Sequence, residues 1–273
     1  MKLMLTMENY SKSKDSPLVL QMLGIGLVKI TQVDIGGKFE VIFQKGIGVP
    51  LIQNILELYK KEIVNKRQGN SIIPLEEFTI FIHYFENQDH DILVIIYMEE
   101  KESSANFSKL YFLSRNINKK FQTNESHHNL IAEFQTAVEI PKTDGIIAIF
   151  ILSATGSPFI SKINKSRSTI SDHEVHISGF ISALLSFSNT IIGEETGAKL
   201  KEINFGNQQF YVISKNNVIF AFLVDNMNNL LQRYMYLLAD EFLNQYKDVI
   251  KEFNGDITPF NVFEEKINQY FII

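Results

Sequence analysis

The chain has 273 residues, of which 45% are hydrophobic and 21% are charged, with a net charge of −5 and a pI near 5.7. These are ordinary globular values, and the length is sufficient for two domains that each bury a core. The net negative charge and the absence of a Lys/Arg run argue against non-specific nucleic-acid binding. The absence of cysteine excludes disulfides, thiolate catalysis and cysteine-based metal sites.

Two features of the sequence bear on cellular location. Residues 1–17 are polar after the first few positions, lack the apolar core of a signal peptide, and are expected to be flexible. The most apolar stretch, residues 145–154, suits a buried strand and is too short to cross a bilayer. We therefore expect a soluble cytoplasmic protein without a membrane span.

The first half predicts the element order β-β-α-β-β-α-α. Its first two strands are joined through residues 34–37, where Asp-Ile-Gly-Gly is a hairpin signal. The first helix has apolar residues on one face and Gln53, Lys60 and Lys61 on the other. The predicted elements are strands 22–33 and 39–43, a helix over 51–63, strands 78–85 and 92–98, and helices 106–121 and 127–138.

The second half predicts the order β-β-α-β-β-β-α-α, which is the first order with one more strand. The combination of Pro141, Asp144 and Gly145 predicts a boundary, so that the expected domains are 1–140 and 141–273. The predicted elements are strands 146–154 and 159–163, a helix over 174–192, strands 198–204, 209–214 and 218–224, a helix over 229–253, and a last helix from residue 258. Together the halves predict an α/β protein of the α+β type, with a mainly antiparallel sheet and covering helices in each domain.

Parts of the second half resemble the longin fold of the longin and roadblock superfamily. Residues 178–184, SGFISAL, resemble the start of the first longin helix. Residues 201–212 resemble its third and fourth strands, and residues 255–263 resemble the step into its last helix. The first half resembles a longin domain in layout only. The resemblance implies two longin-like domains in tandem.

Tandem longin-like domains are similar to assemblies that exchange nucleotide on Rab-type small GTPases, and to longin-domain proteins of archaea. The resemblance implies a protein-interaction module for vesicle trafficking, which binds or regulates a small Ras/Rab-like GTPase or assembles with another longin-like subunit. One alternative is a structural subunit of a trafficking or scaffold complex without exchange activity. Another is a ligand-sensing domain with a pocket between sheet and helices. A homo-oligomer is also open, since fold alone does not fix function.

The sequence shows no catalytic or cofactor-binding motif. His173 and His176 are three residues apart and have no third ligand for a zinc site. Residues 24–26 lack the third glycine of a dinucleotide fingerprint, and residues 193–199 lack the Gly-Lys-Ser/Thr of a phosphate loop. No serine occupies a Gly-x-Ser-x-Gly elbow. We therefore expect no enzyme activity, no cofactor and no metal.

The helix expected over 174–192 is unusual because residues 175–193 contain no Asp, Glu, Lys or Arg. A solvent-facing helix normally carries charge on its outer face. Its broad apolar face includes Phe180 and Leu184, which we expect in the core together with Leu238 of a later helix. The opposite face, here called the serine face, consists of Ser178, Gly179, Ser182, Ser186 and Asn189. We expect it to contact a partner, because small residues permit close approach; the alternative is a neutral, exposed helix.

Overall fold

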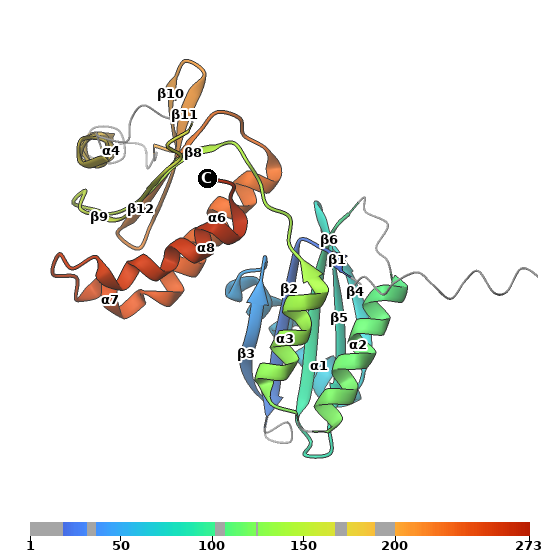
Figure 1. Ribbon diagram of the computed structural model, residues 1–273. Helices are drawn as coiled ribbons and strands as arrows, with labels where there is room; N and C mark the ends of the chain where they lie inside the picture. The colour runs from blue at the N-terminus through green and yellow to red at the C-terminus, as the bar shows by residue number, and fades with distance from the viewer. Residues whose placement is uncertain (1–18, 32–36, 102–106, 124, 167–173, 189–199) are drawn as a thin grey trace, which may run out of the picture. The chain divides into compact units, whose positions relative to one another are not determined.

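The computed structural model describes residues 19–31, 37–101, 107–123, 125–166, 174–188 and 200–273 (Figure 1). The chain divides into two compact units, with unit 1 ending at Ile140 and unit 2 beginning at Pro141. Each unit contains one five-stranded antiparallel sheet with helices on both faces. None of the described helices is both long enough and apolar enough to span a membrane.

Apart from a two-residue strand at each end, unit 1 has the element order β-β-α-β-β-β-α-α around a sheet ordered β3-β2-β6-β5-β4. Helix α1 lies on one face of this sheet, and α2 and α3 lie side by side on the other (Figure 1). The strands are β2 (Gly24–Thr31), β3 (Lys38–Lys45), β4 (Gly69–Pro74), β5 (Phe78–Glu86) and β6 (Ile92–Glu100), and the helices are α1 (Val49–Lys66), α2 (Phe107–Gln122) and α3 (His127–Ala137).

Unit 2 repeats this topology. Its sheet is ordered β10-β11-β12-β8-β9. Read in reverse, as β9-β8-β12-β11-β10, this order corresponds strand by strand to β3-β2-β6-β5-β4 of unit 1. The strands are β8 (Ile146–Ser153), β9 (Pro158–Ile163), β10 (Glu202–Phe205), β11 (Gln208–Lys215) and β12 (Val218–Val224), and the helices are α4 (Glu174–Ser188), α6 (Asn229–Gln245), α7 (Lys247–Lys251), a 3-10 turn (Thr258–Phe263) and α8 (Glu264–Tyr270). The expected α+β class, with a mainly antiparallel sheet and covering helices in each unit, is therefore confirmed.

Both units are closed by the same backbone contact. In unit 1, β1 (Leu20–Gln21) pairs in parallel with β7 (Val138–Glu139), directly after the last helix. In unit 2, Thr143 forms the equivalent parallel bridge with Phe271. The Thr143 amide donates to the Tyr270 carbonyl at 2.9 Å, and the Ile272 amide donates to the Thr143 carbonyl at 2.9 Å. The beginning of each unit is thus tied to its own end.

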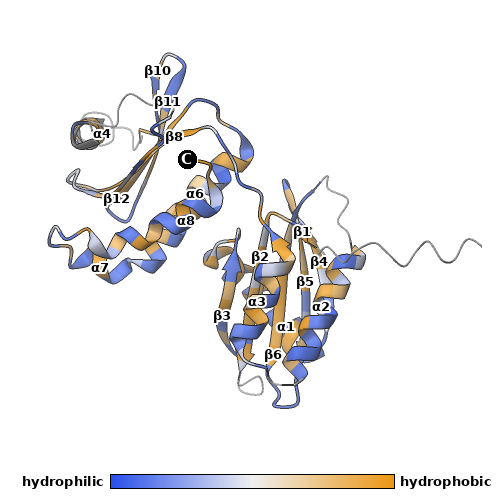
Figure 2. Ribbon diagram, in the orientation of Figure 1, coloured by the Kyte–Doolittle hydropathy of each residue, from blue (hydrophilic) through white to orange (hydrophobic). Residues whose placement is uncertain are grey.

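The central strands are continuous hydrophobic runs because helices cover both faces of each sheet (Figure 2). In unit 2 the two faces have different cores. Phe150 of β8 belongs to the cluster under α4, together with Ile181 and Leu185. Phe220 of β12 points to the other face, where its ring lies 5.7 Å from that of Phe242 in α6.

The structure corrects two predicted elements. The strand that seemed to be missing from the first half is β4, which pairs with β5 at the edge of the sheet. The long helix expected over 229–253 is interrupted at Tyr246, where α6 ends and α7 begins.

Candidate functional site

The orientation of α4 decides which of its residues a partner could reach. Ile181 and Leu185 are buried, at 0% and 5% exposure, and contact the sheet beneath the helix. Ser178 and Ser182 lie beside them and are also buried, at 1% and 8% exposure. Two of the five residues of the expected serine face are therefore buried within the helix's own unit.

The neighbour of Ser182 is the turn between β8 and β9. Its hydroxyl donates a hydrogen bond to the Ala154 carbonyl at 3.0 Å. A Cβ added at Gly156, where φ is +90°, would lie 2.9 Å from the Ser182 Cβ. Small residues are thus required on both sides of this contact, because helix and turn approach so closely.

The expectation that the serine face contacts a partner is wrong for Ser178 and Ser182, because the protein's own hairpin occupies that side. Gly179 and Ser186 are exposed, and their role in an interface stays a prediction. Asn189 lies outside the described residues.

The rotation of α4 leaves aromatic residues on its outer face. Phe180 is 47% exposed and Phe187 is 61% exposed, with exposed Ala183 between them. The expectation that Phe180 is a core residue is therefore wrong. Leu184 is half-buried, and the core position of Leu238 is confirmed at 0% exposure.

A row of rings connects this outer face with the core of unit 2. Phe205 on the edge strand β10 is 50% exposed, and its ring centroid lies 6.4 Å from that of Phe180. It also lies 6.1 Å from Phe210, whose ring lies 6.2 Å from that of buried Phe150. The outer rings are thus supported by packed inner rings, which limits their freedom before any partner binds.

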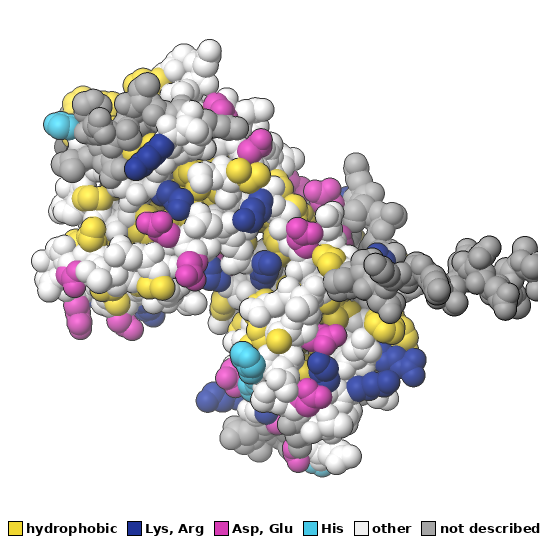
Figure 3. All heavy atoms as spheres, viewed as in Figure 1, with side chains coloured by type: hydrophobic (Ala, Val, Ile, Leu, Met, Phe, Trp, Pro, Cys, Tyr) yellow, Lys and Arg dark blue, Asp and Glu magenta, His cyan; other side chains and the backbone are white. Residues whose placement is uncertain are grey.

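We call Phe180, Phe187 and Phe205 the α4–β10 aromatic patch. Hydrophobic side chains reach the surface at this end of unit 2 (Figure 3). No Asp, Glu, Lys or Arg lies in α4 between residues 175 and 188. Protein interfaces are enriched in aromatic residues and poor in charge at their centres, and aromatic anchors dominate binding energy there. The patch has the chemistry of a protein-binding surface.

The histidines considered for a metal site do not form one in the described part of the chain. His176 is exposed at the start of α4, and His173 lies outside the described residues. Among the residues that the structure describes, no group of three or more His, Cys, Asp or Glu side chains could hold a metal ion.

Comparison with known proteins finds similarity among solved structures. The structure is similar to the crystal structure of a roadblock/LC7 domain from Streptomyces avermitilis, with 14% sequence identity and a TM-score of 0.30. The match covers 37% of this chain and 85% of that chain. No protein-family model and no curated protein sequence matches the chain.

Proposed function

We propose that this protein is a non-catalytic interaction module of the cytoplasm. Its partner is a small Ras/Rab-like GTPase or another longin-like subunit, and the contact is made through the α4–β10 aromatic patch. The observation that supports the proposal is the partial exposure of three phenylalanines, Phe180 and Phe187 on a helix without Asp, Glu, Lys or Arg after its first residue and Phe205 on the neighbouring strand.

The energetics favour covering this patch. Burial of a phenylalanine side chain contributes roughly 1.5–3 kcal/mol relative to leaving it in water. The three rings are already half-buried, at 47%, 61% and 50% exposure, so each gains part of that amount when a partner covers it. Because the Phe180 and Phe205 rings already contact each other, and Phe205 contacts Phe210, these two side chains lose little entropy on binding. A few such anchors can dominate an interface.

An exchange regulator would need no acid–base residues of its own. Such a protein acts by binding the GTPase and displacing the loops that hold the nucleotide, so that the work is done by binding energy. This mode of action agrees with a surface whose prominent side chains are phenylalanines.

The test is a binding assay with the full chain against the small GTPases of its host. Each GTPase is presented without nucleotide, with GDP, and with a GTP analogue, and release of a fluorescent nucleotide is followed. The proposal expects state-dependent binding to at least one GTPase. Stable association with a longin-like subunit, with no dependence on nucleotide state, would favour the structural-subunit alternative. If the chain bound neither a GTPase nor a longin-like subunit, that result would contradict the proposal.

A further inference from the structure

Unit 1 contains a groove on the sheet face that carries α2 and α3. Helix α3 contacts β3 and α2 contacts β5, and the residues of the edge strand β4 on this face, Asn70, Ile72 and Pro74, are exposed. Two hollows of about 190 Å³ and 430 Å³ lie between α2 and the β4–β5 edge. They share Asn70, His83 and Tyr111 in their walls, so they are adjoining parts of one groove, here called the α2–β4 groove.

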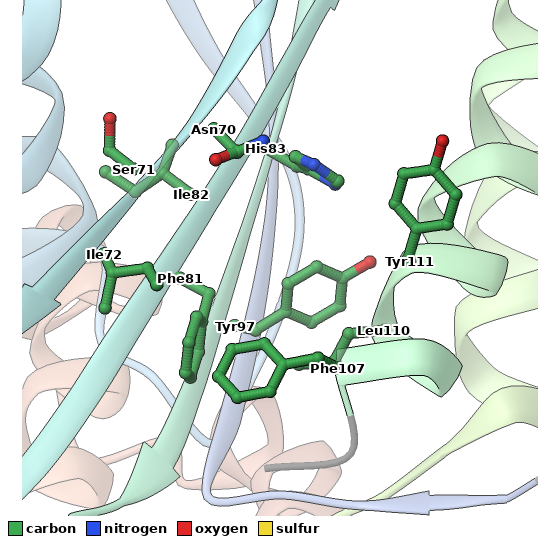
Figure 4. A pocket seen from close by; sticks show the side chains of 10 residues that line it. All are labelled: Asn70, Ser71, Ile72, Phe81, Ile82, His83, Tyr97, Phe107, Leu110 and Tyr111. Atoms are coloured by element: carbon green, nitrogen blue, oxygen red, sulfur yellow. The ribbon is translucent and has the colours of Figure 1, made fainter.

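The smaller hollow is the apolar end of this groove (Figure 4). Phe81 and Phe107 form its wall, with ring centroids 5.1 Å apart in an edge-to-face arrangement. Phe107 and Ile72 are 56% and 57% exposed, so this end opens to solvent. A cavity of about 150 Å³ holds a benzene ring. The space of about 190 Å³ is therefore sufficient for an aromatic ring or a short branched alkyl group.

The floor of the smaller hollow is fixed and uncharged. The hydroxyl groups of Tyr97 and Ser114 share a buried hydrogen bond of 3.0 Å. Burial raises the pKa of the Tyr97 phenol well above its usual range, so that it stays neutral. Ser71 contributes only backbone, because its hydroxyl donates to Glu62 across the sheet at 3.3 Å.

The larger hollow is the polar end of the groove, and among the described residues its lining includes a cationic residue but no acidic one. Its lining includes Asn118 and Arg115, and Arg115 carries the positive charge of this end. His83 lies where the two hollows meet, with its ring centroid 6.2 Å from that of Tyr111. Burial lowers the pKa of His83, so its imidazole is neutral near pH 7. No carboxylate lines either hollow among the described residues, although the chain has a net charge of −5.

Helix geometry brings the two ends within reach of one small molecule. Phe107 and Arg115 are eight residues apart on α2, which corresponds to roughly 12 Å of helix. Side chains on a helix generally lean toward its N-terminus, so we expect the span from Arg115 to the apolar hollow to be shorter than this axial distance. A guanidinium binds a planar carboxylate with two parallel hydrogen bonds.

We propose that the α2–β4 groove of unit 1 binds a small amphipathic carboxylate, with an aromatic or branched alkyl group packed against the Phe81–Phe107 ring pair and the carboxylate at Arg115. A single cation between neutral amides matches one negative charge better than the multiple charges of a phosphate. The groove belongs to unit 1 and the aromatic patch to unit 2, so this inference does not depend on the proposed function.

The test uses the full chain with two probes, 4-phenylbutyrate and its uncharged analogue 4-phenylbutyramide. Binding is measured by ligand-observed NMR and by titration calorimetry. We expect saturable binding of the carboxylate and an affinity for the amide that is weaker by about 10-fold, since a charge-assisted pair is lost. Absence of saturable binding up to about 10 mM, which corresponds to a very weak complex, would overturn the proposal.

Three variants locate the site. Arg115→Gln should weaken phenylbutyrate by about 10-fold and leave the amide unchanged, because only the ion pair is removed. Lys119→Gln removes the same charge one turn further along α2, outside the groove lining, and should change neither affinity. Ile72→Asp places a negative charge at the exposed rim of the apolar end, and should weaken the carboxylate more than the amide. Equal effects of Arg115→Gln and Lys119→Gln, or equal affinity for the two probes, would contradict the assignment.

Discussion

Ser182 lies where α4 passes closest to the turn between β8 and β9. Its hydroxyl satisfies the Ala154 carbonyl at 3.0 Å, and its small side chain permits the approach of Gly156. Ser186 lies one turn further along the same helix and is exposed. The two serines are chemically identical, and their positions relative to the hairpin decide what each can tolerate.

Replacing Ser182 by Glu should destabilise unit 2 by more than about 2 kcal/mol, because a longer, charged side chain cannot be buried there without a partner. Chemical denaturation of the full chain measures the free energy of unfolding. Ser186→Glu is the matched control and should change that free energy by less than about 0.5 kcal/mol. Equal stability of the two variants would mean that the helix is not held against the hairpin as described.

His83 makes stability depend on pH. Burial lowers its pKa below the ordinary value of 6.5, so the folded protein binds a proton less readily than the unfolded chain. As the pH falls through 6.5, His83 is therefore protonated in the unfolded chain before it is protonated in the folded protein. The free energy of unfolding decreases from this pH downward until the pH reaches the pKa of His83 in the folded protein. Tyr111 and Arg115 line the same groove, where no described carboxylate faces the imidazole to offset the effect.

The corresponding prediction is that His83→Gln loses less stability than the parent protein between about pH 7.5 and pH 5, since glutamine does not titrate. Denaturation at several pH values measures this difference, and NMR of the His83 ring gives its pKa directly. Parallel stability curves for the two proteins would show that His83 is not shifted by burial.

At the scale of elements, most strands and helices could be predicted because alternation, helical period and turn residues agree with one another. Strand β4 could not, since Gly69, Asn70, Ser71 and Pro74 are residues typical of turns. It forms because β5 offers six consecutive pairing positions at the sheet edge. That partner is a tertiary contact, which local propensity does not report.

The orientation of α4 also depended on tertiary structure. After Glu174 at its first position the helix has no Asp, Glu, Lys or Arg, so the spacing of its residues could not show which face meets solvent. The turn after β8 decides it by accepting the Ser182 hydrogen bond, and this turns Phe180 outward. The α2–β4 groove was beyond sequence reasoning for a similar reason, because its walls come from β4, β5 and α2.

The orientation of α4 leaves Phe180 exposed, whereas Leu238 of α6 is buried, so the two residues can be compared by mutation. Leu238→Ala should cost about 2–5 kcal/mol, because it leaves a cavity at a position with 0% exposure. Phe180→Ala should cost clearly less than Leu238→Ala, because its ring is 47% exposed. Urea titration of each variant measures the difference. A larger loss for Phe180→Ala than for Leu238→Ala would contradict the orientation of the helix.

At the scale of the whole molecule, each unit is closed by backbone contacts of its own. In unit 2 the Tyr234 hydroxyl also donates to the Pro141 carbonyl at 2.6 Å, which fixes the first residue of the unit. Together with the bridge between Thr143 and Phe271, this contact indicates that the second unit carries what it needs to fold.

We therefore expect residues 141–273 to fold as an isolated fragment, with native helix content and a cooperative unfolding transition. A fragment that begins at residue 146 is the control, since it lacks Pro141 and Thr143, and it should be less stable. Circular dichroism and thermal unfolding measure both. An isolated 141–273 fragment that is unfolded would show that unit 2 depends on unit 1.

The α4–β10 aromatic patch is the basis of the proposed function, and a matched pair of substitutions tests it most directly. Phe187 is 61% exposed on the patch, and Phe112 is 56% exposed on α2 of unit 1. Partners are first recovered with the tagged full chain, and the dissociation constant of each purified partner is then measured for Phe187→Asp and Phe112→Asp. The proposed function predicts that Phe187→Asp weakens binding by about 10-fold or more, as expected for loss of an aromatic anchor, while Phe112→Asp binds like the parent protein. Unchanged affinity of a folded Phe187→Asp variant would contradict the claim that this patch binds the partner.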